Sequence, residues 1–280
     1  MSLIALLTDF GTQDAYVGVM KGVMAGICPD AQFVDLTHVI EPQNVRQGAF
    51  VLMTAFSYFP KGTVFLVVVD PGVGSQRRAI AARAGDYYFI APDNGVLSYV
   101  LRRYPYAVVN ELTSAAHQLA NVSSTFHGRD VFAPAAAYLA AGESLDRLGG
   151  RARDHQKLPQ PALTAQADHL AGEVLHIDHY GNIVTSLGAL AWDHEATLVL
   201  TPAFGSVRKP LRFSASDAVC QISDTQIDGV ARTYAQVGQG DLVALVGSSG
   251  FLEISVNHGS AAERLGARLG DTVEVNIKQA

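Results

Sequence analysis

Apolar residues in the first half of the chain form runs of strand length that alternate with stretches of helix length. The strand-like runs are LIALLTDFG (3–11), AQFVDLTH (31–38), GTVFLVVVDPG (62–72) and YYFIAPDNG (87–95), and the helical stretches are 14–30, 44–60 and 130–142. Pro29 and Pro60 end the first two helices. Apolar strands separated by helices predict an N-terminal, mostly parallel sheet flanked by helices, a Rossmann-like α/β fold.

The pattern changes after about residue 155. The stretch 151–169 is polar, contains two prolines and has no periodicity, and the apolar runs beyond it are short and broken by turn residues. Short strands at this density predict an antiparallel barrel or sandwich. We therefore expect an α/β domain at 1–154, a linker at 155–167 and an all-β domain at 168–280.

Composition and charge exclude several classes of partner. The 280 residues carry 20 Lys and Arg against 26 Asp and Glu, a net charge of −6, so no basic face is expected for nucleic acid or an anionic membrane. Cys28 and Cys220 belong to no CxxC pair, which argues against disulfides or a zinc site. The N-terminal run lacks the features of a signal peptide, and no run approaches the roughly 20 residues that span a bilayer. We expect a cytoplasmic protein without a metal.

Acidic residues follow several of the predicted strands. Asp9 and Asp14 follow the first strand, Asp70 ends six consecutive apolar residues, and Asp93 with Asn94 ends YYFIAP. Ligands bind outside the carboxyl ends of parallel strands, so this set predicts a binding site at one edge of the sheet. Taken singly, each residue could equally cap a helix or a turn.

Two further motifs carry candidate chemistry. The loop DPGVGSQRR places Arg77 and Arg78 close to Asp70, and it matches no phosphate-binding pattern. STFHGRDVF places His127 beside a glycine at the start of the helix 130–142. Arg129 and Asp130 in that motif could form no more than a salt-bridged cap.

These blocks together resemble the S-adenosyl-L-methionine (SAM) hydroxide adenosyltransferases, also called SAM hydrolases, which are related to fluorinase and chlorinase. Seven blocks agree in order, and they are LLTDFGTQDAYVGVMKGVM, CPDAQFVDLTH, FPKGTVFLVVVDPGVGS, IAPDNGVLS, TFHGRDVFAPAAAYLAAG, IDHYGNIVTS and VGSSGFLEISVNHGSA. The resemblance implies an N-terminal α/β domain and a C-terminal β-barrel. It also implies a homotrimer with active sites between the N-domain of one subunit and the C-domain of the next, acting on SAM without a further cofactor.

The resemblance also implies roles for individual residues. The catalytic aspartate, arginine and histidine correspond to Asp70, Arg77 and His127, with Arg78 as the alternative arginine. The residues expected to bind the substrate are Asp9 at the ribose, Asp14 at the methionine part, Asp178, Tyr180 and Asn182 at the methionine and adenine, and Ser248, Glu253 and Asn257 along the same pocket.

The chemistry implied is attack of water or hydroxide on C5′ of the ribose, which releases adenosine and L-methionine. Asp70 is expected to accept a proton from the water or to orient it, while Arg77 and His127 favour hydroxide. Two alternatives remain, a module that binds SAM or adenosine without turnover and a halide adenosyltransferase. A carboxylate at position 70, where halogenases carry an aromatic residue, argues against halide.

Overall fold

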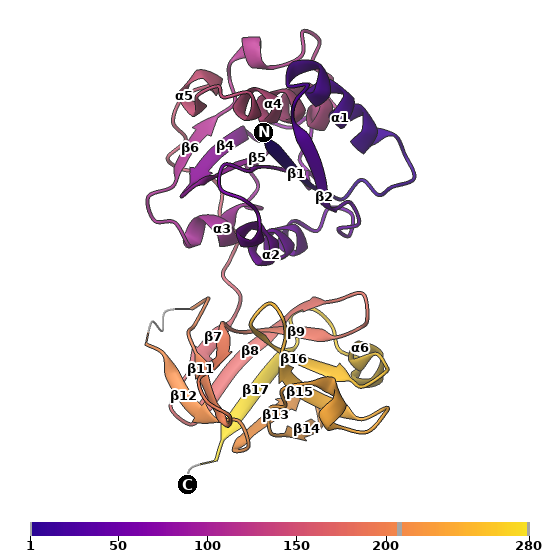
Figure 1. Cartoon of the computed structure of the whole chain (residues 1–280), viewed down its shortest axis with the longest axis vertical. Helices are drawn as coiled ribbons and strands as arrows, with labels where there is room; N and C mark the ends of the chain where they lie inside the picture. The colour runs from indigo at the N-terminus through magenta and orange to yellow at the C-terminus, as the bar shows by residue number, and fades with distance from the viewer. Residues whose placement is uncertain (1, 206–208, 279–280) are drawn as a thin grey trace. The chain divides into compact units, whose positions relative to one another are not determined.

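An α/β unit and an all-β unit follow one another along the chain (Figure 1). The computed structural model describes residues 2–205 and 209–278. The chain divides into two compact units, Met1–Leu158 and Pro159–Ala280. The segment 155–167, which was predicted to be a linker, contains the strand β7 (Leu163–Ala165), which pairs with β8 (His169–Ile177).

Six strands of the described N-terminal residues form one sheet in the order β2-β1-β3-β5-β4-β6. Their bounds are β1 Leu3–Thr8, β2 Gln32–Thr37, β3 Val64–Val68, β4 Ala79–Ala84, β5 Tyr87–Pro92 and β6 Val108–Glu111. The pairs β1–β2, β1–β3 and β3–β5 are parallel, whereas β4 pairs antiparallel with β5 and β6. This confirms the predicted α/β fold with a mostly parallel sheet.

Helices lie on both faces of this sheet, with α1 and α4 on one side and α2 and α3 on the other (Figure 1). Their bounds are α1 Tyr16–Ile27, α2 Val45–Ala55, α3 Ser98–Arg102, α4 Ala133–Ala140 and α5 Leu145–Leu148. Every residue of β3 is buried because helices cover both of its faces. On one face Val64, Leu66 and Val68 pack with Met20 and Met24 of α1.

The C-terminal unit is antiparallel. Its strands are β7 and β8 together with β9 Ile183–Gly188, β10 Leu190–Trp192, β11 Thr197–Leu200, β12 Leu211–Ser214, β13 Ala218–Ile222, β14 Thr225–Asp228, β15 Leu242–Val246, β16 Phe251–Val256 and β17 Thr272–Ile277. The main sheet runs in the order β14-β13-β17-β8-β9-β16-β15, and β10-β11-β12 form a second sheet. A bridge between Ala231 and Leu245 joins the two ends of the main sheet, so a nearly closed barrel results. Of the two predicted all-β architectures, the barrel is the one observed.

No helix in residues 2–205 and 209–278 is long and apolar enough to cross a membrane.

Candidate active site

Three of the predicted acids lie at one edge of the N-terminal sheet. Asp9 follows β1, Asp70 follows β3 and Asp93 follows β5. These three strands are neighbours and run parallel, so their carboxyl ends meet at the same edge. The expectation from the sequence that strand-end acids share one edge is therefore confirmed.

Asp70 and Arg77 form an ion pair across the loop that joins β3 to β4. Nη2 of Arg77 lies 2.5 Å from Oδ2 of Asp70, and Nε lies 2.9 Å from Oδ1. Both side chains are largely buried, with an exposed fraction of 10% for Arg77 and 5% for Asp70. Gly74 in this loop has φ +78°, and a Cβ there would lie 2.4 Å from the carbonyl oxygen of Ser124. Glycine is therefore required for the loop to approach the backbone of Ser124 this closely.

His127 completes this group. Nη2 of Arg77 lies 2.8 Å from Nδ1 of the imidazole. Because a guanidinium only donates hydrogen bonds, Nδ1 must be the acceptor, which leaves the proton of the neutral ring on Nε2. Burial and then the charge of Arg77 lower the pKa of His127 below its ordinary value. The imidazole is therefore neutral over a wider pH range than a free histidine.

Arg78, the predicted alternative to Arg77 as the catalytic arginine, binds other acidic residues. Arg78 binds Asp93, with 2.7 Å between Nη2 and Oδ2, and Asp154, with 2.6 Å between Nη1 and Oδ1. Of the two neighbouring arginines, Arg77 is thus the one in contact with Asp70 and His127.

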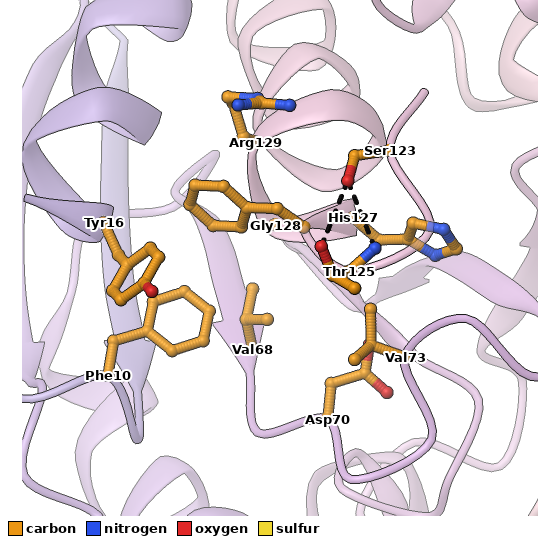
Figure 2. A pocket seen from close by; sticks show the side chains of 11 residues that line it. Phe10, Tyr16, Val68, Asp70, Val73, Ser123, Thr125, His127, Gly128 and Arg129 are labelled. Carbon is orange, nitrogen blue, oxygen red and sulfur yellow. Dashed lines mark hydrogen bonds between the residues drawn. The ribbon is translucent and has the colours of Figure 1, made fainter. Parts of the chain in front are cut away.

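A cavity of about 350 Å³ opens beside Asp70 and His127 (Figure 2). It is lined by Phe10, Tyr16, Val68, Asp70, Val73, Ser123, Thr125, Phe126, His127, Gly128 and Arg129. Phe10, Tyr16 and Phe126 form an aromatic cluster with ring centroids 5.1 to 5.9 Å apart. The cavity therefore combines an aromatic wall with a carboxylate and an imidazole, which suits a ligand with both apolar and polar parts.

The aromatic wall was missed by the sequence analysis, although a signal existed. Phe10 directly follows Asp9, and Phe126 directly precedes His127, so both lie within motifs already singled out. Tyr16 is the first residue of α1. Apolar residues beside strand ends are expected in the core as often as in a pocket, and the pattern alone does not separate the two.

The motif around His127 begins with a π-helical turn, Gly128–Phe132, which leads into α4. The side chain of Asp130 is fully buried and accepts hydrogen bonds from Nε of Arg129 (2.5 Å) and the backbone N–H of Ser123 (2.8 Å). Burial opposes ionisation of Asp130, but these bonds outweigh it and lower the pKa. Asp130 and Arg129 therefore form a salt-bridged pair, and Asp130 also fixes the loop that carries Ser123. The π-helical turn itself is a feature that is frequent at functional sites.

The predicted substrate residues Asp9 and Asp14 are not among the residues that line the cavity, although both lie in the segment between β1 and α1. Oδ2 of Asp9 accepts a hydrogen bond of 2.8 Å from the backbone N–H of Gln43, a residue with φ +69°. Asp14 is exposed in the loop before α1. The same loop carries Phe10, which lines the cavity.

The predicted residues of the C-terminal unit form a second group. Oδ1 of Asp178 accepts hydrogen bonds of 2.9 Å from the backbone N–H groups of Tyr180 and Asn182, and Nδ2 of Asn182 donates to Oδ2. This ordered turn joins β8 to β9 and leaves Tyr180 75% exposed. The backbone of Tyr180 is thus held, while its side chain is exposed and its ring lies 5.4 Å from the ring of His179.

Glu253 is buried on β16, where its Oε1 accepts hydrogen bonds from the hydroxyls of Tyr234 (2.5 Å) and Ser255 (2.9 Å). Burial, this bond and the charges of Glu253 and Asp178 raise the pKa of Tyr234 well above its ordinary value. Tyr234 was missed by the sequence analysis because nothing near it forms a motif. Its contact with Glu253 depends on how the barrel folds.

The two remaining predicted residues lie at the ends of β16. Ser248 is exposed in the turn between β15 and β16. Nδ2 of Asn257 donates a 2.9 Å hydrogen bond to the carbonyl oxygen of Val237. The predicted residues thus fall into two groups, one in each unit. Within residues 2–205 and 209–278, no group of three or more His, Cys, Asp or Glu side chains could hold a metal ion.

Comparison with known proteins places this arrangement in a family. The SAM hydroxide adenosyltransferase N-terminal domain matches residues 4–149, and the SAM hydroxide adenosyltransferase C-terminal domain matches residues 172–274. The chain therefore belongs to the SAM hydroxide adenosyltransferase family, as the motifs predicted.

The similarity to relatives covers nearly the whole chain. The chain is 38% identical over 277 residues to the (R)-S-adenosyl-L-methionine hydrolase of Salinispora tropica, covering 97% of each chain. It is 37% identical to the enzyme of the same name from Thermus thermophilus, covering 98% of this chain and 100% of that one. A fluorinase from Actinopolyspora mzabensis is 30% identical, with 98% of this chain and 96% of the relative covered.

Two solved structures are similar to this chain over nearly its whole length. A crystal structure of an uncharacterized conserved protein from Thermotoga maritima has a TM-score of 0.84 at 36% identity, covering 98% of this chain and 99% of that one. A conserved hypothetical protein from Thermus thermophilus has a TM-score of 0.76 at 35% identity, covering 98% of this chain and 100% of that one.

Proposed function

We propose that this protein is an enzyme that hydrolyses SAM to adenosine and L-methionine. The observation that carries the proposal is the group Asp70, Arg77 and His127, whose carboxylate and imidazole line one cavity. The relatives named (R)-S-adenosyl-L-methionine hydrolase are 30–38% identical to the chain, and those from Salinispora tropica and Thermus thermophilus, at 37–38%, exceed the 30% of the fluorinases.

The proposed reaction begins with a water molecule between Asp70 and His127. The carboxylate accepts a hydrogen bond from the water, while Nε2–H of the neutral imidazole donates one to the water oxygen. The first interaction draws a proton away, and the second stabilises the negative charge that develops. Together they favour hydroxide character in a molecule whose own pKa is about 15.7.

Bond formation and bond cleavage then occur at one saturated carbon. The water oxygen bonds to C5′ of the ribose as the C5′–S bond breaks, and the bonding electron pair returns to sulfur, which leaves as the neutral thioether of methionine. The proton passes to Asp70 and then to solvent. Opposite charges on the nucleophile and the sulfonium neutralise each other, and their attraction is stronger where water is excluded.

Arg77 acts on both partners of the water. Nε and Nη2 of its guanidinium are bonded to Asp70, and Nη2 also contacts His127. The guanidinium pairs with the buried carboxylate, and its hydrogen bond to Nδ1 of His127 holds the tautomer that presents Nε2–H. This geometry favours Arg77 over Arg78 for the role that the motif assigns.

The substrate contacts remain those that the motifs imply. In this proposal Asp9 binds the ribose and Asp14 the methionine part, and no cofactor is needed beyond SAM. Asp178, Tyr180, Asn182, Ser248, Glu253 and Asn257 contribute from the barrel. The resemblance implies that Tyr180 stacks on the adenine, and its 75% exposure supports this role.

The proposal includes a cytoplasmic homotrimer, with each active site between the N-domain of one subunit and the C-domain of the next. The 48% exposure of Tyr16 in the aromatic wall supports a site that is completed by another chain. Light scattering on the purified protein tests the assembly, and a monomeric mass at active concentrations would refute it.

The reaction is tested by incubating the purified protein with SAM in water enriched in ¹⁸O and separating the products by chromatography with mass detection. Adenosine and methionine in equal amounts, with ¹⁸O in the 5′-hydroxyl, are the expected result. SAM or adenosine bound without turnover would instead identify a binding module. Halogenated deoxyadenosine formed in chloride or fluoride would identify a halide adenosyltransferase.

A further inference from the structure

The turn that follows β5 contacts both ends of the loop that carries Asp70 and Arg77. This turn, residues 92–95 with the sequence PDNG, was singled out by its polar residues at a strand end and has no role in the proposed reaction. Its two polar side chains point to different stems of the loop, one to the residue before Asp70 and the other to the residue after Arg77.

Asn94 holds the first stem. Its Nδ2 donates a 2.8 Å hydrogen bond to the carbonyl oxygen of Val69, the residue before Asp70. Its Oδ1 accepts a 3.1 Å hydrogen bond from the backbone N–H of Val96. Because both ends of the amide are engaged, the side chain has one orientation, and the position of Val69 is fixed relative to β5.

Asp93 holds the second stem. Its backbone N–H donates to the carbonyl oxygen of Arg78 (2.9 Å), and its carboxylate accepts from Nε of the same residue (2.9 Å). The carboxyl group is 2% exposed, and its other oxygen accepts a 2.7 Å hydrogen bond from the backbone N–H of Gln156. Arg78 also binds Asp154. This stem is therefore held by both backbone and side-chain contacts in a buried environment.

The loop between the stems has short-range hydrogen bonds of its own, from the backbone N–H of Val73 to the carbonyl oxygen of Asp70 (3.2 Å) and from the hydroxyl of Ser75 to the carbonyl oxygen of Gly72 (2.6 Å). It contains Gly72 and Gly74, and glycine restricts backbone conformation least of all residues. The ion pair holds Asp70 and Arg77 together within the loop, while the position of this pair relative to β5 and His127 depends on where the two stems are anchored. A displacement of about 1 Å at reacting groups can cost on the order of 100-fold in rate.

We propose that Asp93 and Asn94 are positioning residues that anchor the two stems of the loop 70–77 and thereby keep Asp70 and Arg77 in register with His127. This inference rests on the proposed function, because it assigns these residues to the hydrolysis of SAM. Neither residue is proposed to touch the substrate.

The test uses the full-length protein and the variant Asn94→Asp. This substitution keeps the size and the acceptor for Val96, but it replaces the donor to Val69 with a second oxygen. We expect kcat to fall about tenfold or more while KM for SAM changes less than about threefold, since the reacting groups and not the binding contacts are displaced. In the Asp70→Asn background the same substitution should cause little further loss, because the two changes act through one group.

A second measurement does not depend on turnover. The pKa of His127 followed by NMR should rise toward 6.5 in Asn94→Asp, because a displaced loop moves the charge of Arg77 away from the ring. Asp70 and Asp130 are the other charged groups acting on this ring, and both raise its pKa. Asp130 lies outside the loop and stays in place, whereas Asp70 moves with Arg77 and offsets only part of the rise, because its effect on the ring is the smaller of the two. A wild-type protein that forms no adenosine would refute the proposed function, while this titration would still report on the anchoring.

The matched control lies at the other end of the same strand. Asp86 precedes β5 and forms an exposed ion pair of 2.9 Å with Lys61. Asp86→Asn should leave kcat and the pKa of His127 unchanged. If Asn94→Asp does not fold, Asp93→Asn tests the second stem by the same measurements. A folded variant at either stem with an unchanged kcat, or with an unchanged His127 titration, would overturn the proposal.

Discussion

Nη2 of Arg77 lies 2.8 Å from Nδ1 of His127, and this contact determines which nitrogen of the imidazole carries the proton. Since arginine cannot accept a hydrogen bond, Nδ1 must be unprotonated. The residue that pairs with Asp70 thus also sets the form of His127.

Replacing Asp70 with Asn should lower kcat for adenosine formation by about 100-fold or more, because the amide is too weakly basic to draw a proton from water. The affinity for SAM should stay within about threefold, since the attacking water and not the substrate contacts this group. Chromatography of adenosine measures the first quantity and calorimetry with SAM the second. Unchanged turnover would remove Asp70 from the reaction.

Replacing Arg77 with Lys should also lower kcat by about 100-fold. An ammonium keeps the charge, but it lacks the planar fork that contacts both oxygens of Asp70 and Nδ1 of His127. The control is Arg83→Lys on β4, whose guanidinium lies on the exposed side of the strand, 5.9 Å from the ring of Tyr88. Steady-state kinetics should separate the two variants, and equal rates in both would contradict the assigned role of Arg77.

The pKa of His127 should lie below 6.5 when it is measured by NMR, because burial and the charge of Arg77 both disfavour the protonated ring. The unfolded chain then binds more protons than the folded one between that lowered pKa and 6.5. The contribution of His127 to the free energy of unfolding is therefore greatest above 6.5 and falls as the pH drops through this window.

Activity should follow the same titration. The rate is expected to decline on the acidic side, with a midpoint below 6.5, as the ring gains a second proton and loses the bond from Arg77. In His127→Gln this acidic limb should disappear from the pH profile of the remaining activity. A midpoint above 6.5 in the NMR titration would contradict the assignment of a neutral imidazole.

Replacing Gly128 with Ala should destabilise the protein by about 1–3 kcal/mol, because the new Cβ crowds a packed wall. It would lie 3.1 Å from Cε2 of Phe126 and 3.2 Å from Sδ of Met20. KM for SAM should rise as well, since Gly128 lines the cavity. The control is Gly150→Ala, where a Cβ has no neighbour within 4 Å. Thermal denaturation should show a lower melting temperature for Gly128→Ala and an unchanged one for Gly150→Ala. Equal melting temperatures in the two variants would show that Phe126 and Met20 move to accommodate the new Cβ without a loss of stability.

Much of the fold was predictable from local pattern. The strands at β1, β3 and β5 are apolar runs that end at an acid, and the predicted helices appear as α1, α2 and α4. Strand β4 was not predicted. It lies between β5 and β6 and pairs antiparallel with both, and its own residues contain no pattern that predicts this position in the sheet.

The candidate site was predictable to the same extent. Its acids, arginine and histidine lie in motifs that can be recognised along the chain, and the aromatic residues of the wall are their immediate neighbours. The partners of Arg77 and Arg78 were not predictable, because the two residues are adjacent and chemically identical. Both residues precede β4, and one side chain binds Asp70 while the other binds Asp93.

The sequence by itself determined which chemical groups this protein has and which strands and helices carry them, because hydrophobic periodicity and turn residues act over a few neighbouring positions. Only the tertiary structure decided which of these groups touch. Arg77 and His127 are 50 residues apart, and their contact exists because the β3–β4 loop and the turn before α4 are packed against the same edge of the sheet. Interactions over such separations depend on how the whole unit packs, and no local pattern encodes them.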